Sequence, residues 1–368
     1  MSKLSRCFAF FVTPHGFGHA SRAAAVAESL TRRLPPCQFE FFTTVPKHHI
    51  AASVENFHYQ TLNCDVGMVQ ADALRADLPK TLQRLNSFLP FDSTEVQRLV
   101  AYLERQHCIA VISDISPLGL QVARTAGLPS VLIENFTWDW IYQGYALRHP
   151  QMGSHAAYLS SIFACADLNL QCQPICHTKS DGVLTSPVSR RFQKDPATVR
   201  SHLGLSPATK MVFISMGGTP HSLPDLEMLA KHYGDIAFVI AGHCPTRETP
   251  SNIRLLPINT PLFHPDLVRS ANVVIGKVGY STIAEVYQAG VPFGYFSRLE
   301  NPEMGPLLSF LEDKIQGIHF RDSDYQTSAW LDHLEALLSM PRIDRSREAN
   351  GADQCADAIA QLVGSESI

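Results

Sequence analysis

The chain has 368 residues, of which 45% are hydrophobic and 17% charged, a composition typical of a folded globular protein with two or three domains. Its 30 Lys and Arg and 34 Asp and Glu residues give a formal charge of −4 at pH 7, which excludes a positive field that holds nucleic acid non-specifically. The nine cysteines lack paired spacing, so we expect reduced thiols, a cytoplasmic protein and no metal site. The apolar run at residues 7–13 is too short to cross a bilayer.

Apolar runs of strand length alternate with amphipathic stretches of helix length along the chain. Their Val, Ile and Phe residues are continuous rather than alternating with polar ones, which is typical of parallel strands covered on both faces. The pattern therefore predicts an α/β protein with doubly wound, Rossmann-like sheets. The predicted strands are residues 7–13, 38–44, 109–113, 130–134, 211–215, 236–241, 253–256, 272–276 and 291–296.

A stretch rich in Ser, Pro and charge, residues 186–209, interrupts this pattern and predicts a linker. We expect an N-terminal, acceptor-side domain over 1–188 and a C-terminal, ligand-binding domain over 189–345. The final segment, 346–368, predicts an amphipathic helix that packs back on the N-terminal domain. Ligands of such sheets bind at the carboxyl ends of the strands, so we expect the site there, in a cleft between two facing domains.

A glycine turn and a run of strong helix formers follow the first predicted strand. Gly16 and Gly18 permit a tight turn with exposed backbone N–H groups, which favours an oxygen-rich ligand. His19 follows at the helix N-terminus, where the helix dipole disfavours imidazolium, and a neutral ring accepts a proton. We predict that His19 is a general base. A histidine that caps the helix or packs at a domain interface is the alternative interpretation.

Asp114 ends the third predicted strand, on the same sheet edge as His19. Its carboxylate is expected to accept the other ring N–H of His19 and fix the tautomer, as carboxylates do in hydrolase triads. A helix-capping aspartate is the alternative. Aromatic residues at 136–142 follow the next strand and predict core packing, with one or two side chains lining the site. We expect Asn135 and Trp138 at that site.

The glycine turn recurs in the second half of the chain, after the strands at 211–215 and 272–276, with Gly217, Gly218 and Gly279. Ser281 or Thr282 is then expected to begin a helix that carries Glu285. Backbone N–H and hydroxyl groups at this helix N-terminus suit a diphosphate, and an ionised Glu285 suits a ribose diol. A capping box, in which Thr282 caps the helix and Glu285 reaches back, is the alternative.

A polar cluster follows the last predicted strand, at residues 291–296. Such side chains bind sugar hydroxyls, or simply face water on a surface loop. The cluster consists of Arg298, Glu300, Asn301 and Glu303.

Two common nucleotide-binding motifs are incomplete in this sequence. The dinucleotide fingerprint needs a third glycine where Ser21 stands, and the P-loop needs Ser or Thr where Val278 follows Lys277. A nicotinamide oxidoreductase and a P-loop ATPase are therefore disfavoured.

Several of these segments resemble the GT-B superfamily of nucleotide-sugar enzymes, in particular the glycosyltransferase-like domain of plant L-arabinokinases and its bacterial relatives. The likeness extends over most of the chain and implies two Rossmann-like domains facing a central cleft. We expect no sugar kinase activity, because the phosphate loop of the GHMP kinases does not occur here. The segments that carry the likeness are 16–22, 113–117, 135–140, 276–282 and 350–353.

The segment 279–285 also resembles, more distantly, the N-acetylglucosaminyltransferase that makes lipid II. That resemblance implies that Gly279, Ser281 and Thr282 contact a diphosphate and that Glu285 contacts the ribose. The paired glutamines that bind the donor sugar in that family are replaced here by the polar cluster, so no donor sugar is implied.

The first glycine turn resembles the UDP-sugar hydrolase of pseudaminic acid synthesis in its pattern G-x-G-H-x-x-R, here Gly16, Gly18, His19 and Arg22. In that family the histidine activates water. The same base therefore serves transfer or hydrolysis, and the resemblance implies that Arg22 lies with it on the acceptor side.

Together these patterns predict an inverting, metal-independent glycosyltransferase of the hexosyl or N-acetylhexosaminyl type. It is expected to move a sugar from a nucleoside-diphosphate sugar, with UDP as the expected nucleotide, to the hydroxyl of an unidentified acceptor. The donor is a co-substrate, and no cofactor is expected. A nucleotide-sugar hydrolase, a UDP-sugar 2-epimerase and a non-catalytic sugar-nucleotide-binding protein are the alternatives.

Overall fold

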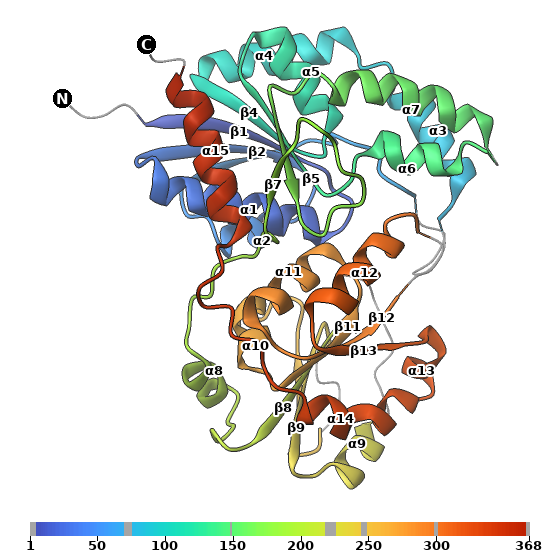
Figure 1. Ribbon diagram of the computed structural model, residues 1–368. Coiled ribbons are helices and arrows are strands. Elements are labelled where there is room, and N and C mark those ends of the chain that lie inside the picture. The colour runs from blue at the N-terminus through green and yellow to red at the C-terminus, as the bar shows by residue number, and fades with distance from the viewer. Residues whose placement is uncertain are drawn as a thin grey trace. The chain divides into compact units, whose positions relative to one another are not determined.

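The computed structural model describes residues 5–69, 76–147, 149–217, 226–243, 249–297 and 301–365. The chain forms two compact α/β units (Figure 1), Met1–Ser189 with Ala349–Ile368 (unit 1) and Arg190–Glu348 (unit 2). The sequence analysis placed the corresponding boundaries after residues 188 and 345.

Unit 1 is built on a sheet of seven strands in the order β3-β2-β1-β4-β5-β6-β7, all parallel. The central strands are mostly apolar and buried because helices cover the sheet on both faces. Phenylalanines stack between them, as in the pair Phe11 and Phe42, whose ring centroids are 4.4 Å apart. The strands are β1 (Arg6–Val12), β2 (Cys37–Thr43), β3 (Phe57–Thr61), β4 (Cys108–Asp114), β5 (Ser130–Glu134), β6 (Leu168–Cys172) and β7 (Val183–Thr185).

Consecutive strands of unit 1 are connected through helices, as is typical of a parallel sheet, except for β6 and β7, which a loop joins. The helices of unit 1 are α1 (Phe17–Arg33), α2 (Lys47–Ala51), α3 (Leu78–Phe88), α4 (Ser93–Arg105), α5 (Pro117–Ala126), α6 (Trp138–Tyr145), α7 (Pro150–Phe163) and α15 (Gly351–Ser365).

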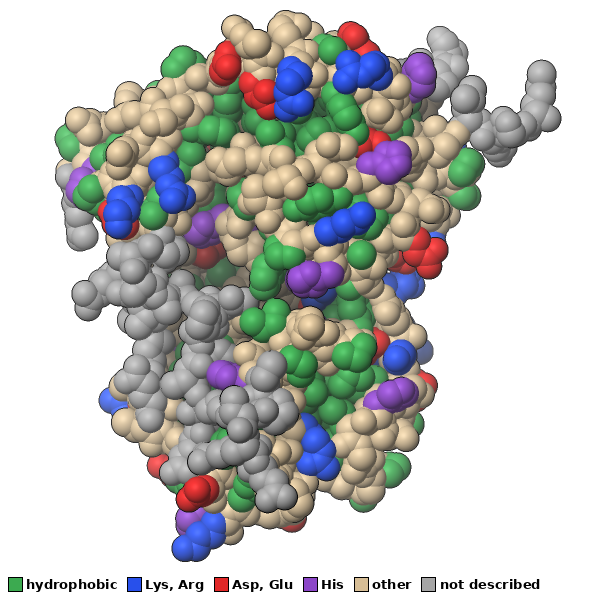
Figure 2. Space-filling model, turned by 180° about the vertical axis from the view of Figure 1, so that it is seen from behind, with side chains coloured by type: hydrophobic (Ala, Val, Ile, Leu, Met, Phe, Trp, Pro, Cys, Tyr) green, Lys and Arg blue, Asp and Glu red, His purple; other side chains and the backbone are tan. Residues whose placement is uncertain are grey.

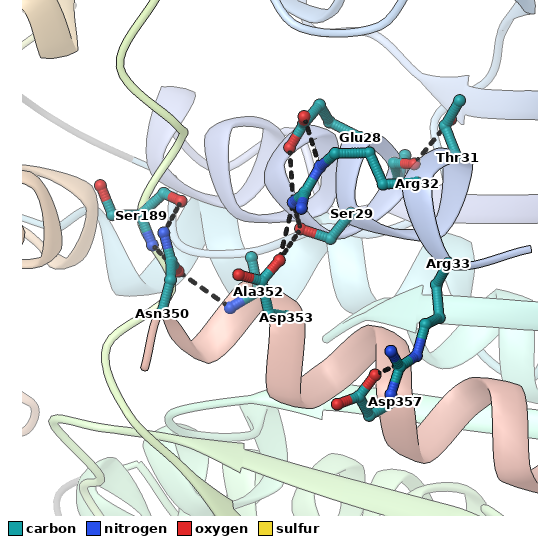
Figure 3. A network of polar contacts seen from close by, with 11 residues as sticks. Glu28, Ser29, Thr31, Arg32, Arg33, Ser189, Asn350, Ala352, Asp353 and Asp357 are labelled. Carbon is teal, nitrogen blue, oxygen red and sulfur yellow. Dashed lines mark hydrogen bonds and ion pairs between the residues drawn. The ribbon is translucent and has the colours of Figure 1, made fainter. Parts of the chain in front are cut away.

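The last helix, α15, packs against α1 within unit 1 (Figure 3). Arg32 and Arg33 of α1 form ion pairs with Asp353 and Asp357 of α15. The helix begins at Gly351 rather than at residue 346, because the side chain of Asn350 accepts hydrogen bonds from the backbone N–H groups of Ala352 and Ser189 and so holds the chain at the helix start.

Unit 2 is built on a sheet of six strands in the order β10-β9-β8-β11-β12-β13, again all parallel. The predicted fold class, parallel α/β in both halves, is thereby confirmed. Its strands are β8 (Lys210–Ser215), β9 (Ile236–Ala241), β10 (Ile253–Leu256), β11 (Val273–Lys277), β12 (Phe293–Phe296) and β13 (Gly317–Phe320). Its helices are α8 (Pro196–His202), α9 (Leu226–His232), α10 (His264–Ser270), α11 (Tyr280–Ala289), α12 (Met304–Lys314), α13 (Asp322–Gln326), the 3₁₀ helix η1 (Ala329–His333) and α14 (Leu334–Ser339).

Four strands were absent from the sequence prediction, β3, β6, β7 and β13. They lie at or next to sheet edges, where part of each strand meets solvent and polar residues break the apolar run. The expected linker at 186–209 is also partly wrong, since it contains α8, which Asp195 caps by accepting a hydrogen bond from the backbone N–H of Thr198.

The surface matches the balanced composition of the chain. On the face drawn in Figure 2, basic and acidic side chains are interspersed, and the described residues there form no extended basic patch. Within the part of the chain that the structure describes, no helix combines the length and the apolar character needed to span a membrane.

Candidate active site

Each unit carries a carboxylate that contacts both an arginine and a histidine at the carboxyl end of its sheet. The cluster in unit 1, here the His19 cluster, consists of His19, Arg22, Asp114 and Asn135. The cluster in unit 2, here the His264 cluster, consists of Arg190, Ser215, His264 and Glu285.

The glycine turn after β1 places His19 in the first turn of α1. Gly16 precedes this helix with a φ of 81°, a backbone conformation that glycine adopts without strain. Asp114 ends β4, the sheet neighbour of β1, and its Oδ1 lies 2.9 Å from Nδ1 of His19. The predicted contact between His19 and Asp114 is therefore present.

Arg22 lies one turn further along α1 and binds the same carboxylate. Its Nε donates to Oδ2 of Asp114 at 2.8 Å, and a terminal nitrogen donates to Oδ1 at 2.7 Å. The other terminal nitrogen donates to the side-chain oxygen of Asn135 at 2.7 Å. Arg22 and Asn135, expected to meet an acceptor, are instead buried, and they hold Asp114 in place.

The charges of the neighbouring side chains determine which ring nitrogen of His19 carries the proton. Burial by itself raises the pKa of Asp114, but the Arg22 guanidinium overcomes it and the net pKa is lowered, so the carboxyl is ionised. An ionised carboxylate only accepts, and therefore Nδ1 of His19 donates. Burial also lowers the pKa of His19. The ring is thus neutral at pH 7, with its lone pair on Nε2.

The capping alternatives for these two residues are wrong. The residue before α5 is Ser116 rather than Asp114, and the N-cap of α1 is Gly16, with no side-chain hydrogen bond. Burial, rather than the helix dipole named in the sequence analysis, is the largest cause of the lowered pKa of His19.

In unit 2, the expected helix after β11 is α11, which begins at Tyr280. Its N-cap is Gly279, with no side-chain hydrogen bond, so the capping box of Thr282 and Glu285 is wrong. A Cβ added at Gly279, and likewise at Gly217 or Gly16, would meet no atom of the described residues within 4 Å. The space beside all three glycine turns is open, as a ligand that approaches the backbone requires.

Glu285 lies on α11 and is buried, with 1% of its surface exposed. Its Oε1 accepts hydrogen bonds from Nε and a terminal nitrogen of Arg190 at 3.0 and 2.8 Å. Its Oε2 lies 2.6 Å from Nδ1 of His264, whose Nε2 lies 2.9 Å from the hydroxyl of Ser215. Burial raises the pKa of Glu285, but the positive charge of Arg190 and the contact with His264 bring it down to about 2.

Known proteins were compared with this chain. No family model matches it. L-arabinokinase of Arabidopsis thaliana is 27% identical over 344 residues, which cover 90% of this chain and 32% of that protein, so the chain spans about a third of the relative's length. The crystal structure of a UDP-glucosyltransferase from Polygonum tinctorium matches with a TM-score of 0.67 and 13% identity, over 99% of this chain and 100% of that one. The glycosyltransferase of kitacinnamycin matches with a TM-score of 0.65 and 14% identity, over 97% and 99%.

The chain has the GT-B fold of glycosyltransferases. The predicted GT-B architecture is thereby confirmed, and the L-arabinokinase likeness is present at the level of sequence. Within this GT-B chain, the His19 cluster and the His264 cluster occupy the strand ends at which the sequence analysis expected a site.

Some expected site residues lie elsewhere in the GT-B structure. Trp138 is 1% exposed and packs in the core against Phe136 and Tyr142, so it does not line a ligand site. Asn301 donates to Glu303 at 2.9 Å beside the N-terminus of α12. Three further predictions, Gly218, Arg298 and Glu300, lie outside the described residues.

Metal ligands do not gather in the described part of this GT-B chain: no three His, Cys, Asp or Glu residues there could hold a metal ion. One Asp-x-Asp sequence does occur, at residues 322–324. It begins α13, and Asp324 accepts a hydrogen bond from the backbone N–H of Arg321.

Sequence analysis also missed a buried carboxyl in unit 1, Asp65. Burial raises its pKa to about 7. Its Oδ2, the hydroxyl of Thr13 and the indole nitrogen of Trp138 are buried atoms with no hydrogen-bond partner among the described residues. Asp65 follows β3, an edge strand that the sequence pattern did not reveal, and so no motif pointed to it.

Proposed function

We propose that this protein is an inverting, metal-independent glycosyltransferase that uses a nucleoside-diphosphate sugar, with UDP as the expected nucleotide. One observation carries the proposal: the ionised Asp114 holds Nδ1 of His19, so that the lone pair of a neutral imidazole is left on Nε2. The GT-B fold supports it, because a UDP-glucosyltransferase shares that fold.

In this proposal Nε2 of His19 accepts the proton of an acceptor hydroxyl. The hydroxyl oxygen attacks the anomeric carbon from the side opposite the diphosphate, and the bond to the diphosphate oxygen breaks with its electron pair. One displacement of this kind inverts the anomeric configuration. Asp114 stabilises the imidazolium that forms, as the carboxylate of a hydrolase triad does.

Unit 2 is proposed to bind the nucleoside diphosphate. Backbone N–H groups at the start of α11 and at Gly217, with the hydroxyls of Ser281 and Thr282, offset the charge of the leaving diphosphate. The transfer therefore needs no metal ion or other cofactor. Asn301 and Glu303 are the candidate sugar contacts among the described residues.

The compartment proposed for this activity is the cytoplasm, where nucleotide sugars would reach the protein. All cysteines in the described part of the chain are free thiols, which supports a reducing compartment. The acceptor is an unidentified hydroxyl compound rather than a nucleic acid, given the net charge of −4.

This function is tested by a nucleotide-binding screen, followed by a variant that lacks the proposed general base, His19. A nucleoside diphosphate at a hundred times its Kd should stabilise the fold by about 2.7 kcal/mol. The variant His19→Ala should bind that nucleotide normally but no longer release it from the nucleotide sugar in the presence of an acceptor extract. The control is His48→Ala, on the exposed part of α2.

Three other results would contradict the proposal. Free sugar released without an acceptor would indicate a hydrolase, and an isomeric nucleotide sugar would indicate an epimerase. Nucleotide binding without any turnover would indicate a binding protein, since the His19 cluster would then serve structure alone.

A further inference from the structure

Within the His264 cluster, a ligand meets His264 rather than Glu285, the residue that the sequence analysis expected to bind it. Glu285 is 1% exposed, and its two oxygens accept three hydrogen bonds from Arg190 and His264. The side chain of His264 is 30% exposed. A ligand at this strand end therefore reaches the imidazole before it reaches the carboxylate.

We propose that His264, rather than Glu285, contacts a ribose hydroxyl of the nucleoside diphosphate, and that Glu285 and Arg190 position the imidazole for this contact. The proposal deepens the proposed function and rests on it. It assigns the ligand-binding atom to Nε2 of His264.

The tautomer of His264 selects a hydroxyl as its ligand. Glu285 is ionised and only accepts, so Nδ1 of His264, which lies 2.6 Å from Oε2, carries a proton. When the ring carries this proton alone, its lone pair is on Nε2, which lies 2.9 Å from the hydroxyl of Ser215 and can accept a hydrogen bond from it. A ribose hydroxyl donates in the same way and can replace that of Ser215, whereas a phosphate oxygen without a proton cannot.

Arg190 keeps Glu285 from turning towards a ligand. Its guanidinium binds Oε1 through two nitrogens and lies 5.0 Å from the centre of the Phe263 ring. Turning the carboxylate outward would break both of these hydrogen bonds to a buried cation, which is unfavourable. The carboxylate is therefore fixed, and His264, the most exposed side chain of the His264 cluster, is the one that meets the ligand.

The backbone places these groups where the diphosphate is proposed to bind. Ser215 is the last residue of β8, and His264 is the first residue of α10. Gly217, two residues after Ser215, has a φ of 70° and open space at its Cβ position. β8 and β11 are neighbours in the sheet, so the turn that leads into α11 lies at the same edge.

Two substitutions of His264 distinguish direct contact from positioning. In His264→Asn the side-chain amide still donates to Glu285, but no acceptor stands at the position of Nε2. In His264→Gln the amide oxygen reaches the position of Nε2, but the hydrogen bond to Glu285 is lost. The matched control is His202→Asn, an exposed histidine of unit 2 whose Nδ1 contacts only the backbone oxygen of Thr198.

The probes are UDP, 2′-deoxy-UDP and 3′-deoxy-UDP, with binding measured by titration calorimetry and folding by thermal unfolding. The wild type and His202→Asn should bind UDP about tenfold more tightly than one of the two deoxy forms, the worth of a good hydrogen bond. His264→Asn should bind all three alike, and His264→Gln should retain part of the preference.

The opposite pattern would overturn the proposal. If His264→Asn keeps the full preference for UDP, Glu285 itself contacts the ribose. If the wild type binds all three probes alike, the hydroxyl contact does not exist. If the wild type binds no nucleoside diphosphate at all, the proposed function fails first and this inference fails with it, which is a distinguishable result.

Discussion

In both the His19 cluster and the His264 cluster, an arginine and a histidine bind one carboxylate. The two clusters differ in which carboxylate oxygen each of these side chains binds. Arg22 binds both oxygens of Asp114, and His19 shares Oδ1 with it. In unit 2, Arg190 binds Oε1 of Glu285 alone and leaves Oε2 to His264. Glu285 thus binds Arg190 and His264 through separate oxygens.

The fourth member of each cluster makes the larger difference. In unit 1, Asn135 accepts a hydrogen bond from Arg22 and forms none with the histidine. Nε2 of His19 has no hydrogen-bond partner among the described residues. In unit 2 the hydroxyl of Ser215 instead lies 2.9 Å from Nε2 of His264, within hydrogen-bond distance. A lone pair without a partner suits a base that accepts a proton, whereas a lone pair that already accepts a hydroxyl suits a site that binds hydroxyls. The fourth residue therefore sets the proposed role of each histidine.

The largest expected effect comes from removing each buried arginine. Arg22→Met leaves the fully buried Asp114 without its countercharge, and we expect a loss of about 3–5 kcal/mol in the free energy of unfolding of unit 1. Arg190→Met should cost unit 2 less, because Arg190 and Glu285 are less completely buried than Arg22 and Asp114. Hydrogen exchange of peptides from β4 and β11, read by mass spectrometry, reports the two units separately.

A double variant provides the control for this comparison. Arg22→Met with Asp114→Asn removes both charges and should recover part of the loss, since no uncompensated carboxylate is then buried. If Arg22→Met and Arg190→Met cost the same, the different division of the two carboxylates has no energetic consequence.

A somewhat smaller effect is expected from the pH dependence of Asp65. The pKa of this carboxyl is raised to about 7 in the folded protein, against about 3.9 in an unfolded chain. The folded state therefore binds the proton more tightly, and the stability that this contributes is complete below about pH 4 and is lost as the pH rises through about 7. At about 1.4 kcal/mol per pH unit, the total is about 4 kcal/mol.

Asp65→Asn abolishes this titration. Between pH 4 and pH 8 the variant should therefore gain about 4 kcal/mol in stability relative to the wild type, as measured by urea unfolding at a series of pH values. A difference between the two proteins that stays constant with pH would show that Asp65 does not titrate in this range.

The sequence predicted the parts of this molecule that depend on neighbouring residues in the chain. The apolar strands of both parallel sheets and the glycine turns before α1 and α11 follow from local pattern. The contact of His19 with Asp114 was predicted because both residues lie at ends of predicted strands on one sheet edge. Their catalytic role stays a prediction.

Contacts that depend on tertiary packing were not predictable in this way. Arg190 and Glu285 are 95 positions apart, and Arg190 lies in the segment that the sequence analysis treated as a linker. His264 stands in no motif, because its function depends on partners from β8 and α11. Arg22 was assigned to a ligand site by resemblance and Asn135 by its position after a strand, whereas in the structure both are buried, Arg22 against Asp114 and Asn135 against Arg22.

The smallest expected effect comes from Ser215, the residue that distinguishes the two clusters. Ser215→Ala removes one hydrogen bond to His264 and should cost unit 2 about 1 kcal/mol of stability. If the ribose hydroxyl takes the place of the Ser215 hydroxyl at Nε2, the variant should nevertheless bind UDP about two- to fivefold more tightly, because no internal donor competes.

Unit 1 offers a matched control for this last variant, since the hydroxyl of Ser21 also lies 2.9 Å from Nε2 of a histidine, His49. Ser21→Ala should lose similar stability with no change in UDP affinity. Weaker UDP binding by Ser215→Ala would mean that the Ser215 hydroxyl itself contacts the ligand, rather than occupying the position at Nε2 of His264 that the ribose hydroxyl takes. The His264 cluster would then bind its ligand through two residues, and the contrast with His19 would lie in the serine itself.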